Sequence, residues 1–228
     1  MATRKFDALL IDFYGTISAG DREAVECACR RVVTDFELPF TSAEFAVRWG
    51  ERFFDLIERS NHGDFRTLYE CELRSLKDTL RPLVGEMDPV PYVADIEAYW
   101  AAPPVHPDAI EMLQRVNVPV CCVSNADTAP LLSAIARAGV RFDHVVASES
   151  VRCYKPDSAI FQNAIDLLQV AATRAIHVGD SKHSDIGGAA KLGITTAWIC
   201  RDDRIHDIGV TEPHHTVRSL VEICDLLG

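Results

Sequence analysis

The first apolar run of the chain, residues 8–11, has the length of a strand and ends directly on a carboxylate, Asp12. Uninterrupted apolar runs are typical of strands buried on both faces of a parallel sheet. The Gly15-Thr16 turn that follows therefore predicts Asp12 at the C-terminal end of a buried strand, the edge where open α/β sheets carry out their chemistry. An aspartate here is equally typical of a turn or a helix cap, so the rest of the chain must decide.

After this run the apolar period changes to that of amphipathic helices, and no strand pattern is convincing before residue 105. An Arg81-Pro82 pair is expected to end the third helix, and Ala101 to Pro104 forms a return linker. These features predict a small all-helical domain over residues 18–104. Its helices are expected at residues 21–36, 42–59, 64–80 and 92–100.

From residue 105 onward, strand and helix patterns alternate. Repeated βα units imply a parallel sheet with right-handed crossovers. We therefore predict an α/β protein with a Rossmann-like parallel-sheet core, helices on both faces, built from residues 1–17 and 105–228. Strands are expected at 118–123, 144–147, 175–178 and 195–199, and helices at 129–138, 156–168, 184–192 and 217–227.

Composition narrows the classes of partner. The formal net charge of -11 argues against nucleic acid, although a local basic pocket for a small anion remains compatible with it. No apolar run is long enough to cross a membrane and no signal-peptide pattern is present, so we expect a cytoplasmic protein with no membrane partner. The eight cysteines are scattered and are expected to be reduced thiols. Nothing in the sequence indicates a homo-oligomer.

Polar residues of related kinds follow the first four predicted core strands. A carboxylate nucleophile, a hydroxyl donor, a cation and a carboxylate pair are the parts needed to bind and attack a small anionic substrate. Each residue alone has an ordinary structural explanation, but together they indicate one site. The residues are Asp12, Ser124, Asn125, Lys155, Asp180, Ser181 and Asp185.

These segments resemble the four motifs of the haloacid dehalogenase-like hydrolase superfamily, in order and spacing, over essentially the whole chain. The helical insert resembles the cap of the subfamily that carries it between motifs one and two. The resemblance implies that Asp12 is a nucleophile forming an ester that water cleaves, and that Lys155 neutralises charge beside it. It implies that Thr16 and Ser124 donate hydrogen bonds, with Ser124 and Asn125 near the substrate. In the phosphatase branch, Mg²⁺ would be held by Asp12, Asp180, Asp185 and the Tyr14 carbonyl, which suits a hard cation.

Tyr14 and Asp180 do not match the same branch of the superfamily. Most of its phosphatases carry a second aspartate, an acid and base, where this chain has Tyr14, and a phenol is a poor base at neutral pH. Tyrosine there resembles the 2-haloacid dehalogenases, which use no metal and carry a serine where this chain has Asp180. An aspartate beside Asp12 without a cation brings like charges together.

We therefore predict Mg²⁺-dependent hydrolysis of a small phosphate monoester, with Asp185 and Tyr14 also among the catalytic residues. Two alternatives remain open: metal-independent 2-haloacid dehalogenation, and a catalytically weak or inactive protein that binds phosphate or metal.

Further candidates belong to the helical insert and the fourth motif. Arg48 is placed roughly where dehalogenases clamp the substrate carboxylate, although arginine on an amphipathic helix is usually solvated. Other candidates for specificity are Arg52, Phe53 and Phe54. His183 could supply a missing base, although loop histidines are usually surface residues. His214-His215 and Asp202-Asp203 lack partners at ligand spacing and are expected at the surface.

Overall fold

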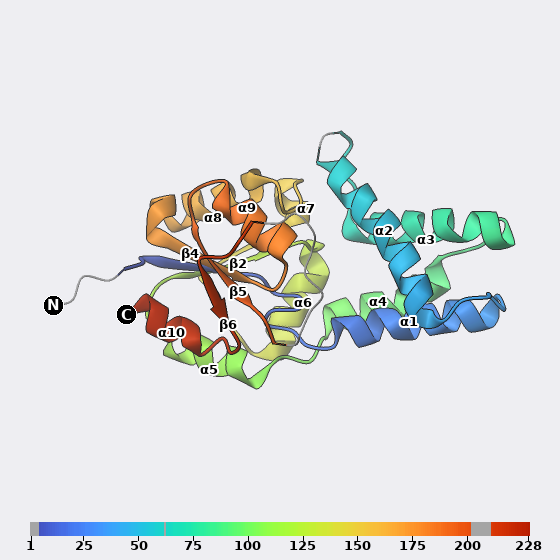
Figure 1. The fold of residues 1–228 in the computed structure, drawn as a ribbon. Helices are drawn as coiled ribbons and strands as arrows, with labels where there is room; N and C mark the ends of the chain where they lie inside the picture. The colour runs from blue at the N-terminus through green and yellow to red at the C-terminus, as the bar shows by residue number, and fades with distance from the viewer. Residues whose placement is uncertain (1–4, 62, 202–210) are drawn as a thin grey trace.

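A six-stranded parallel sheet forms the centre of the computed structural model, which describes residues 5–61, 63–201 and 211–228. Its strand order is β3-β2-β1-β4-β5-β6, so the chain leaves β1 in one direction and returns on its other side (Figure 1). This is the topological switch point at which α/β sheets bind ligands. The strands are β1 (Ala8–Ile11), β2 (Val120–Ser124), β3 (His144–Ala147), β4 (Ala175–Gly179), β5 (Thr195–Ile199) and β6 (His215–Val217).

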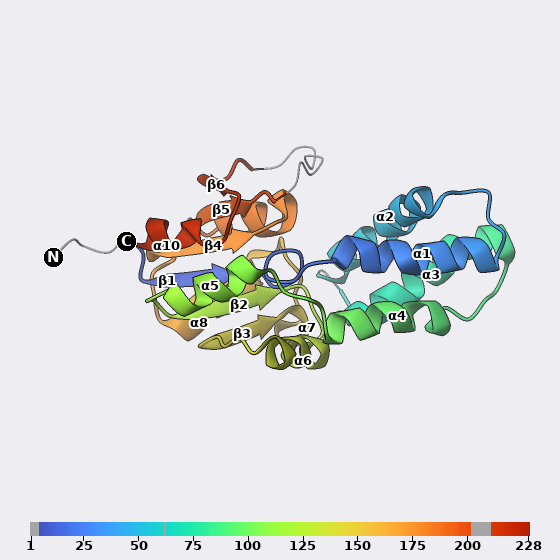
Figure 2. The same cartoon turned by 90° about the horizontal axis from the view of Figure 1, so that it is seen from below.

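Helices cover both faces of the sheet, as a parallel sheet requires. Apolar residues of α5, α6 and α10 pack on one face, and those of α8 and α9 pack on the other (Figure 2). The predicted Rossmann-like α/β fold is therefore confirmed. The helices are α5 (Pro107–Arg115), α6 (Thr128–Ala138), α7 (Ser148–Val151), α8 (Ser158–Leu168), α9 (Gly188–Ala190) and α10 (Glu222–Leu227), with a 3-10 turn at Ala172–Arg174 and a π-helical turn at Lys182–Gly187.

Four further helices form a separate group beside the sheet, which we call the helical lobe (Figures 1 and 2). Thr41 and Thr67 each form a capping box with a glutamate three residues later, which fixes where α2 and α3 begin. The lobe has its own apolar core, which includes Phe45, Trp49 and Leu76. Its helices are α1 (Asp21–Asp35), α2 (Ser42–Ser60), α3 (Leu68–Val84) and α4 (Val90–Ala101).

The two connections between lobe and sheet run side by side. Ser18 and Val105 form an antiparallel bridge, and the Ala19 amide donates to the Pro104 carbonyl at 2.9 Å. Side chains add further links: the Asp127 carboxylate accepts from the first two amides of α3, at 2.6 and 3.0 Å. Asn61 exchanges two hydrogen bonds with the backbone of Tyr154, at 2.6 and 2.9 Å. That the lobe is an independent domain acting as a cap stays a prediction.

Several predicted boundaries were wrong. Pro82 lies inside α3 without ending it, and the helix starts at Leu68 and not at residue 64 because Thr67 caps it. The helix α5 was not expected at all. The predicted closing helix begins only at Glu222, because residues 215–217 form β6 at the sheet edge. His214 is exposed and bonds to Thr196, whereas Asp202-Asp203 lies outside the described residues. In the described ranges, no helix is both long and apolar enough to span a membrane.

Candidate active site

Asp12 follows β1 at the C-terminal edge of the sheet, where the sequence placed it. Parallel pairing with β4 fixes its backbone, since the Asp12 amide donates to the Val178 carbonyl at 2.9 Å. Its side chain is buried, and Oδ1 accepts from Lys155 Nζ at 2.6 Å and from Ser124 Oγ at 3.2 Å. The other oxygen, Oδ2, is buried and has no hydrogen-bond partner in the part of the chain that the structure describes. Asp12 therefore has one oxygen anchored and one available for attack.

Lys155 joins the carboxylates of Asp12 and Asp185. Its ammonium lies 2.6 Å from Asp12 Oδ1, 2.6 Å from Asp185 Oδ1 and 3.0 Å from the Val123 carbonyl. All three charged residues are at most 4% exposed. One buried cation thus satisfies two buried carboxylates from different segments, which fixes the relative positions of the strand ends.

Asp185 is held from a second side by His177, a residue of β4 that the sequence reasoning did not single out. His177 Nε2 lies 3.0 Å from Asp185 Oδ1, while the Ser181 amide donates to Asp185 Oδ2 at 3.1 Å. The sequence signal that could have revealed His177 is a histidine inside an otherwise apolar strand, and the structure shows that it is fully buried. His177 therefore positions Asp185 without reaching Asp12.

Burial and pairing move the pKa values of these groups in different directions. Burial raises the pKa of Asp12, and Asp185 adds to the rise, whereas Lys155 opposes it. Burial also opposes ionisation of Asp185, but Lys155 and His177 outweigh it and lower its pKa to about 2. Burial disfavours the Lys155 ammonium, yet its two carboxylate partners raise its pKa above the usual value. Lys155 and Asp185 therefore stay charged at neutral pH.

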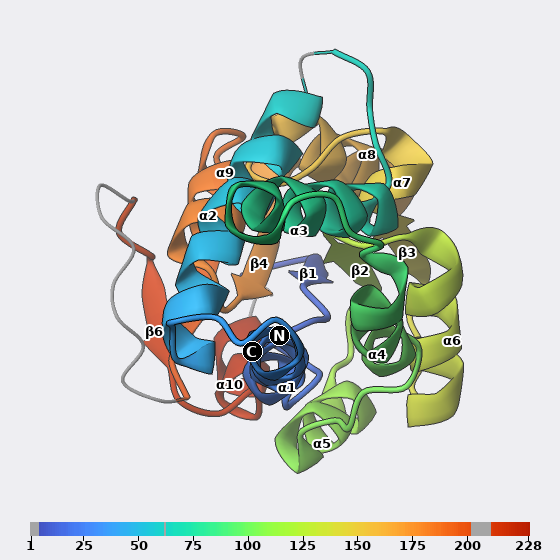
Figure 3. The same cartoon turned by 90° about the vertical axis from the view of Figure 1, so that its right-hand side faces the viewer.

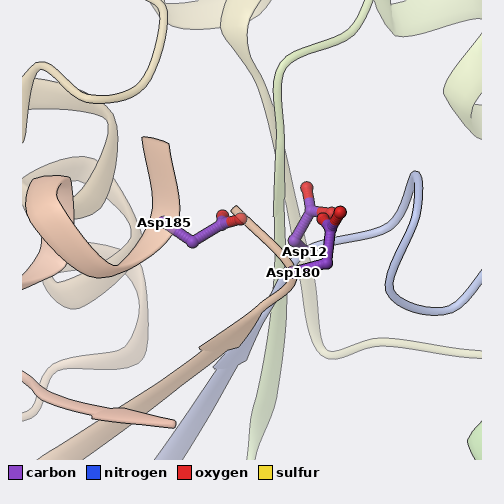
Figure 4. Close-up of side chains that lie close together, drawn as sticks. All are labelled: Asp12, Asp180 and Asp185. Atoms are coloured by element: carbon purple, nitrogen blue, oxygen red, sulfur yellow. The ribbon is translucent and has the colours of Figure 1, made fainter. Parts of the chain in front are cut away.

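A third carboxylate, Asp180, joins this site directly after β4. Oxygens of Asp12, Asp180 and Asp185 all lie within 4.8 Å of one another, and Figure 4 shows Asp185 pointing toward the adjacent Asp12 and Asp180. Thr16 Oγ1 donates to Asp180 Oδ1 at 3.4 Å. The donor set and the unpartnered Asp12 Oδ2 fit a hard cation such as Mg²⁺. Both Asp185 oxygens already accept hydrogen bonds, so a cation would compete with Lys155, His177 and the Ser181 amide for this carboxylate.

Tyr14, two residues after Asp12, is turned toward the helical lobe. Its hydroxyl donates to the Trp100 carbonyl at 2.7 Å, and its ring packs edge-on against the Trp100 ring at 4.8 Å. Burial raises its pKa, with smaller contributions from neighbouring groups. The phenol is therefore neutral and its proton is engaged, so this structure does not place Tyr14 to act as a base.

Of the remaining predicted residues, Asn125 contacts the Lys155 segment, whereas Arg48 and His183 are exposed. Asn125 exchanges hydrogen bonds with the backbone amide and carbonyl of Lys155, at 2.8 and 3.2 Å, and so holds the segment that carries the ammonium. Arg48 is exposed and stacks on the Phe40 ring at 4.3 Å, so the structure does not bring it to Asp12. The exposed His183 pairs with Glu58 of α2 at 2.7 Å. Roles of these three side chains in substrate binding or catalysis stay predictions.

Gly15 allows the motif-one loop to pass close to Asp180. Its φ is +81°, and a Cβ added there would lie 2.8 Å from Asp180 Oδ2. We expect Gly15→Ala to lower the free energy of unfolding by about 1–3 kcal/mol and to reduce activity, because it strains the backbone and displaces Asp180. Urea unfolding measures the first effect. Gly139→Ala is the control, since Gly139 has φ +67° but open space around it. Equal losses in the two variants would show that the Asp180 contact contributes nothing.

The switch point of this α/β sheet thus carries a buried aspartate, a lysine and further carboxylates, as the four sequence motifs predict. The family model of the haloacid dehalogenase-like hydrolases matches residues 6–193, so the chain belongs to this family. The resemblance stated from the motifs is thereby confirmed.

Similar proteins carry names from more than one branch. The chain is 25% identical over 223 residues to (S)-2-haloacid dehalogenase of Pseudomonas sp. strain YL, covering 96% of this chain and 93% of that protein. Pyrimidine 5'-nucleotidase YjjG of Escherichia coli is 32% identical over 126 residues, covering 53% and 56%. The solved L-2-haloacid dehalogenase from Xanthobacter autotrophicus superimposes with a TM-score of 0.79 at 20% identity, over 97% and 98% of the chains, and supports the fold.

Proposed function

We propose that this hydrolase acts on 2-haloacids, with Asp12 displacing halide from carbon. The observation that carries the proposal is Tyr14: the position that would hold an acid and base for an alkoxide leaving group has a neutral phenol bonded to Trp100. A halide leaves without protonation, so the first step needs no acid at the Tyr14 position. The near full-length similarity to a haloacid dehalogenase supports the same choice over our sequence-based preference for a phosphatase.

In the first step, Asp12 Oδ2 attacks the carbon that bears the halogen. A C–O bond forms, the C–X bond breaks, and halide departs with the bonding electron pair. Lys155 and Ser124 keep the carboxylate oriented through Oδ1. The first product is an ester on Asp12.

In the second step, water adds to the carbonyl carbon of the Asp12 ester and releases a 2-hydroxyacid. The C–O bond to the substrate oxygen breaks, one proton of the water ends on the hydroxyl of the 2-hydroxyacid, the other passes to solvent, and the Asp12 carboxylate is restored. We assign orientation of this water to Asp185, whose ionised carboxylate beside Lys155 would accept a hydrogen bond from the water without taking up its proton. His177 keeps the Asp185 carboxylate in place during this step.

A second candidate function, Mg²⁺-dependent hydrolysis of a phosphate monoester, is favoured by one specific observation. Asp180 places a third carboxylate within 4.8 Å of those of Asp12 and Asp185. Asp12, Asp180 and Asp185 would hold Mg²⁺, which would supply positive charge to offset that of a bound phosphate. The partial match to a nucleotidase supports this alternative over about half of the chain.

Parallel product assays separate the two functions. We expect halide release from 2-chloropropionate or longer 2-chloro acids that EDTA does not reduce, and no release of phosphate from an aryl phosphate with Mg²⁺. Phosphate release that requires Mg²⁺, without halide release, would establish the second function instead. If neither product forms although phosphate or metal binds, the chain is a binding protein and the proposed function is wrong.

The Asp180→Ser variant is expected to affect the two candidate reactions differently in the same assays. For a dehalogenase we expect the variant to retain or raise halide release, because it removes a negative charge beside the nucleophile. For a metal-dependent phosphatase it removes a ligand and should lower phosphate release by about 10²-fold or more. Ser184→Ala, on the same loop, is a control outside the carboxylate group.

A further inference from the structure

A pocket of about 630 Å³ lies among the four helices of the lobe. Viewed from the lobe side, α1 to α4 surround the ends of β1 and β4 (Figure 3). Trp100 lines the pocket and also contacts Tyr14, the residue two positions after Asp12. Val47 and Phe54 also line the pocket, and both are 63% exposed, so solvent reaches this part of the wall. The pocket is therefore placed to receive the part of a substrate that extends away from the reacting carbon.

Aromatic side chains supply much of the pocket wall. The Trp49 indole is held in place, because Nε1 donates to Ser75 Oγ at 2.8 Å. Phe53 and Phe54 pack edge to face with ring centroids 5.4 Å apart. Faces of indole and phenyl rings attract cations as well as apolar groups. The four aromatic residues of the wall are Trp49, Phe53, Phe54 and Trp100.

The charges of the pocket are predominantly negative. Among its described lining residues there is one basic side chain, the exposed Arg22, against four acidic ones. The arginines expected to clamp an anion, Arg48 and Arg52, are exposed and are not among the lining residues. The acidic residues are Asp21, Glu26, Glu51 and Glu72. Such a pocket repels a second anionic group and attracts a cation.

Glu72 is the buried polar group of this pocket. It belongs to α3, is 3% exposed, and accepts a hydrogen bond from the Trp100 indole through Oε1 at 2.7 Å. Its Oε2 is buried and receives no hydrogen bond from an N–H or hydroxyl group of the described residues, while the Glu97 carboxyl lies close enough to share a hydrogen bond with Glu72. Burial raises the pKa of Glu72 well above its usual value, against the Trp100 hydrogen bond, and nearby Glu97 adds to the rise. A cationic donor would satisfy Oε2 and favour the ionised carboxylate.

We propose that the lobe pocket binds an organic ammonium group, with Glu72 as its specificity-determining partner and the aromatic wall around its apolar stem. This inference deepens the proposed function and rests on it in one respect: the substrates would be 2-haloacids whose side chain ends in an ammonium. The haloacid end lies toward Asp12 and the ammonium end lies at Glu72. Neutral or anionic side chains of the same size are poorer ligands.

Binding of three probes of similar shape to the intact protein tests the pocket without requiring turnover. The probes are 2-phenylethylammonium, 2-phenylethanol and 3-phenylpropionate. Their binding is measured by titration calorimetry and by the fluorescence of Trp49 and Trp100. We expect the ammonium to bind at least about 10-fold more tightly than the alcohol, and the carboxylate to bind most weakly. Glu72→Gln should bring the ammonium and the alcohol within about twofold of each other.

Matched variants assign the effect to the buried carboxyl. Glu51→Gln removes the same charge from an exposed pocket residue and should change the affinity ratio by less than about twofold. If Glu72→Gln fails to fold, Phe53→Leu replaces it, because loss of an aromatic face should lower the preference for ammonium over alcohol by about threefold. Equal affinity for the three probes, or a preference for ammonium that both variants retain, would overturn the proposal.

The result stays separable from the chemistry at Asp12. Asp12→Asn should bind 2-phenylethylammonium with unchanged affinity, since Asp12 is not among the pocket residues. Selective binding without halide release from any 2-chloro acid would remove the proposed function and leave the ammonium pocket. Halide release without a preference for the ammonium probe would remove the ammonium pocket and leave the proposed function.

Discussion

Asp12→Asn is expected to abolish turnover, with a loss of at least about 10³-fold, while the protein keeps its fold. The amide keeps the shape of the side chain but cannot form the ester as a carboxylate does. Rates of halide and phosphate release measure the effect for both candidate reactions. Activity close to that of the wild type would exclude Asp12 as the nucleophile.

The same variant is expected to leave the stability of the protein nearly unchanged, because two effects oppose each other. Burial raises the Asp12 pKa in the folded protein, so ionisation of Asp12 disfavours the folded state as pH rises through that pKa. Asparagine removes this cost but also removes one partner of Lys155, which keeps Asp185. We therefore expect the free energy of unfolding at pH 7 to change by less than about 1 kcal/mol. Circular dichroism and urea unfolding test this, and a large loss would show that Asp12 is chiefly structural.

Lys155→Met is expected to cost both activity and stability. The methionine fills a similar volume but leaves the Asp12 and Asp185 carboxylates buried without their shared cation. Removing one partner of a buried ion pair costs about 3–5 kcal/mol. Urea unfolding at pH 7 measures the loss. Lys191→Met is a matched control, because Lys191 is exposed and bonds only to the Pro156 carbonyl in the described contacts.

The pH dependence separates the charge effect from a packing effect. Lys155 and His177 lower the pKa of Asp185 to about 2, so the stability that its ionised form contributes is present above about pH 4. That contribution is lost as pH falls through the folded-state pKa. The stability gap between wild type and Lys155→Met should therefore narrow toward pH 2. A constant gap would indicate lost packing.

The sheet and the order of its site residues could be predicted because each lies directly after an apolar run. Asp12 and Asp180 follow β1 and β4, Ser124 is the last residue of β2, and the parallel pairing of those strands brings their ends to one edge. Lys155 comes from a loop, yet it reaches both carboxylates because the site is compact. Chain-local patterns were sufficient for these residues.

Other features depend on packing between segments far apart in the sequence. Glu72 looks like an ordinary polar position of an amphipathic helix until α4 places Trp100 over it. The role of Tyr14 also depends on Trp100, 86 residues away. The strand β6 has three residues and pairs only along one side, so its pattern merged with that of the following helix. Local periodicity does not contain this information.

The links between lobe and sheet bear on how this enzyme can be re-engineered. Asn61 holds the backbone of Tyr154, the neighbour of Lys155, and Asp127 caps α3 from the loop that follows β2. A chimera that takes the lobe helices of a relative would lose the hydrogen bonds that hold the segment carrying Lys155, unless both contacts were also introduced. Substrate selectivity and the geometry around Asp12 therefore change together, and laboratory evolution of the pocket has to preserve the contacts of Asn61 and Asp127.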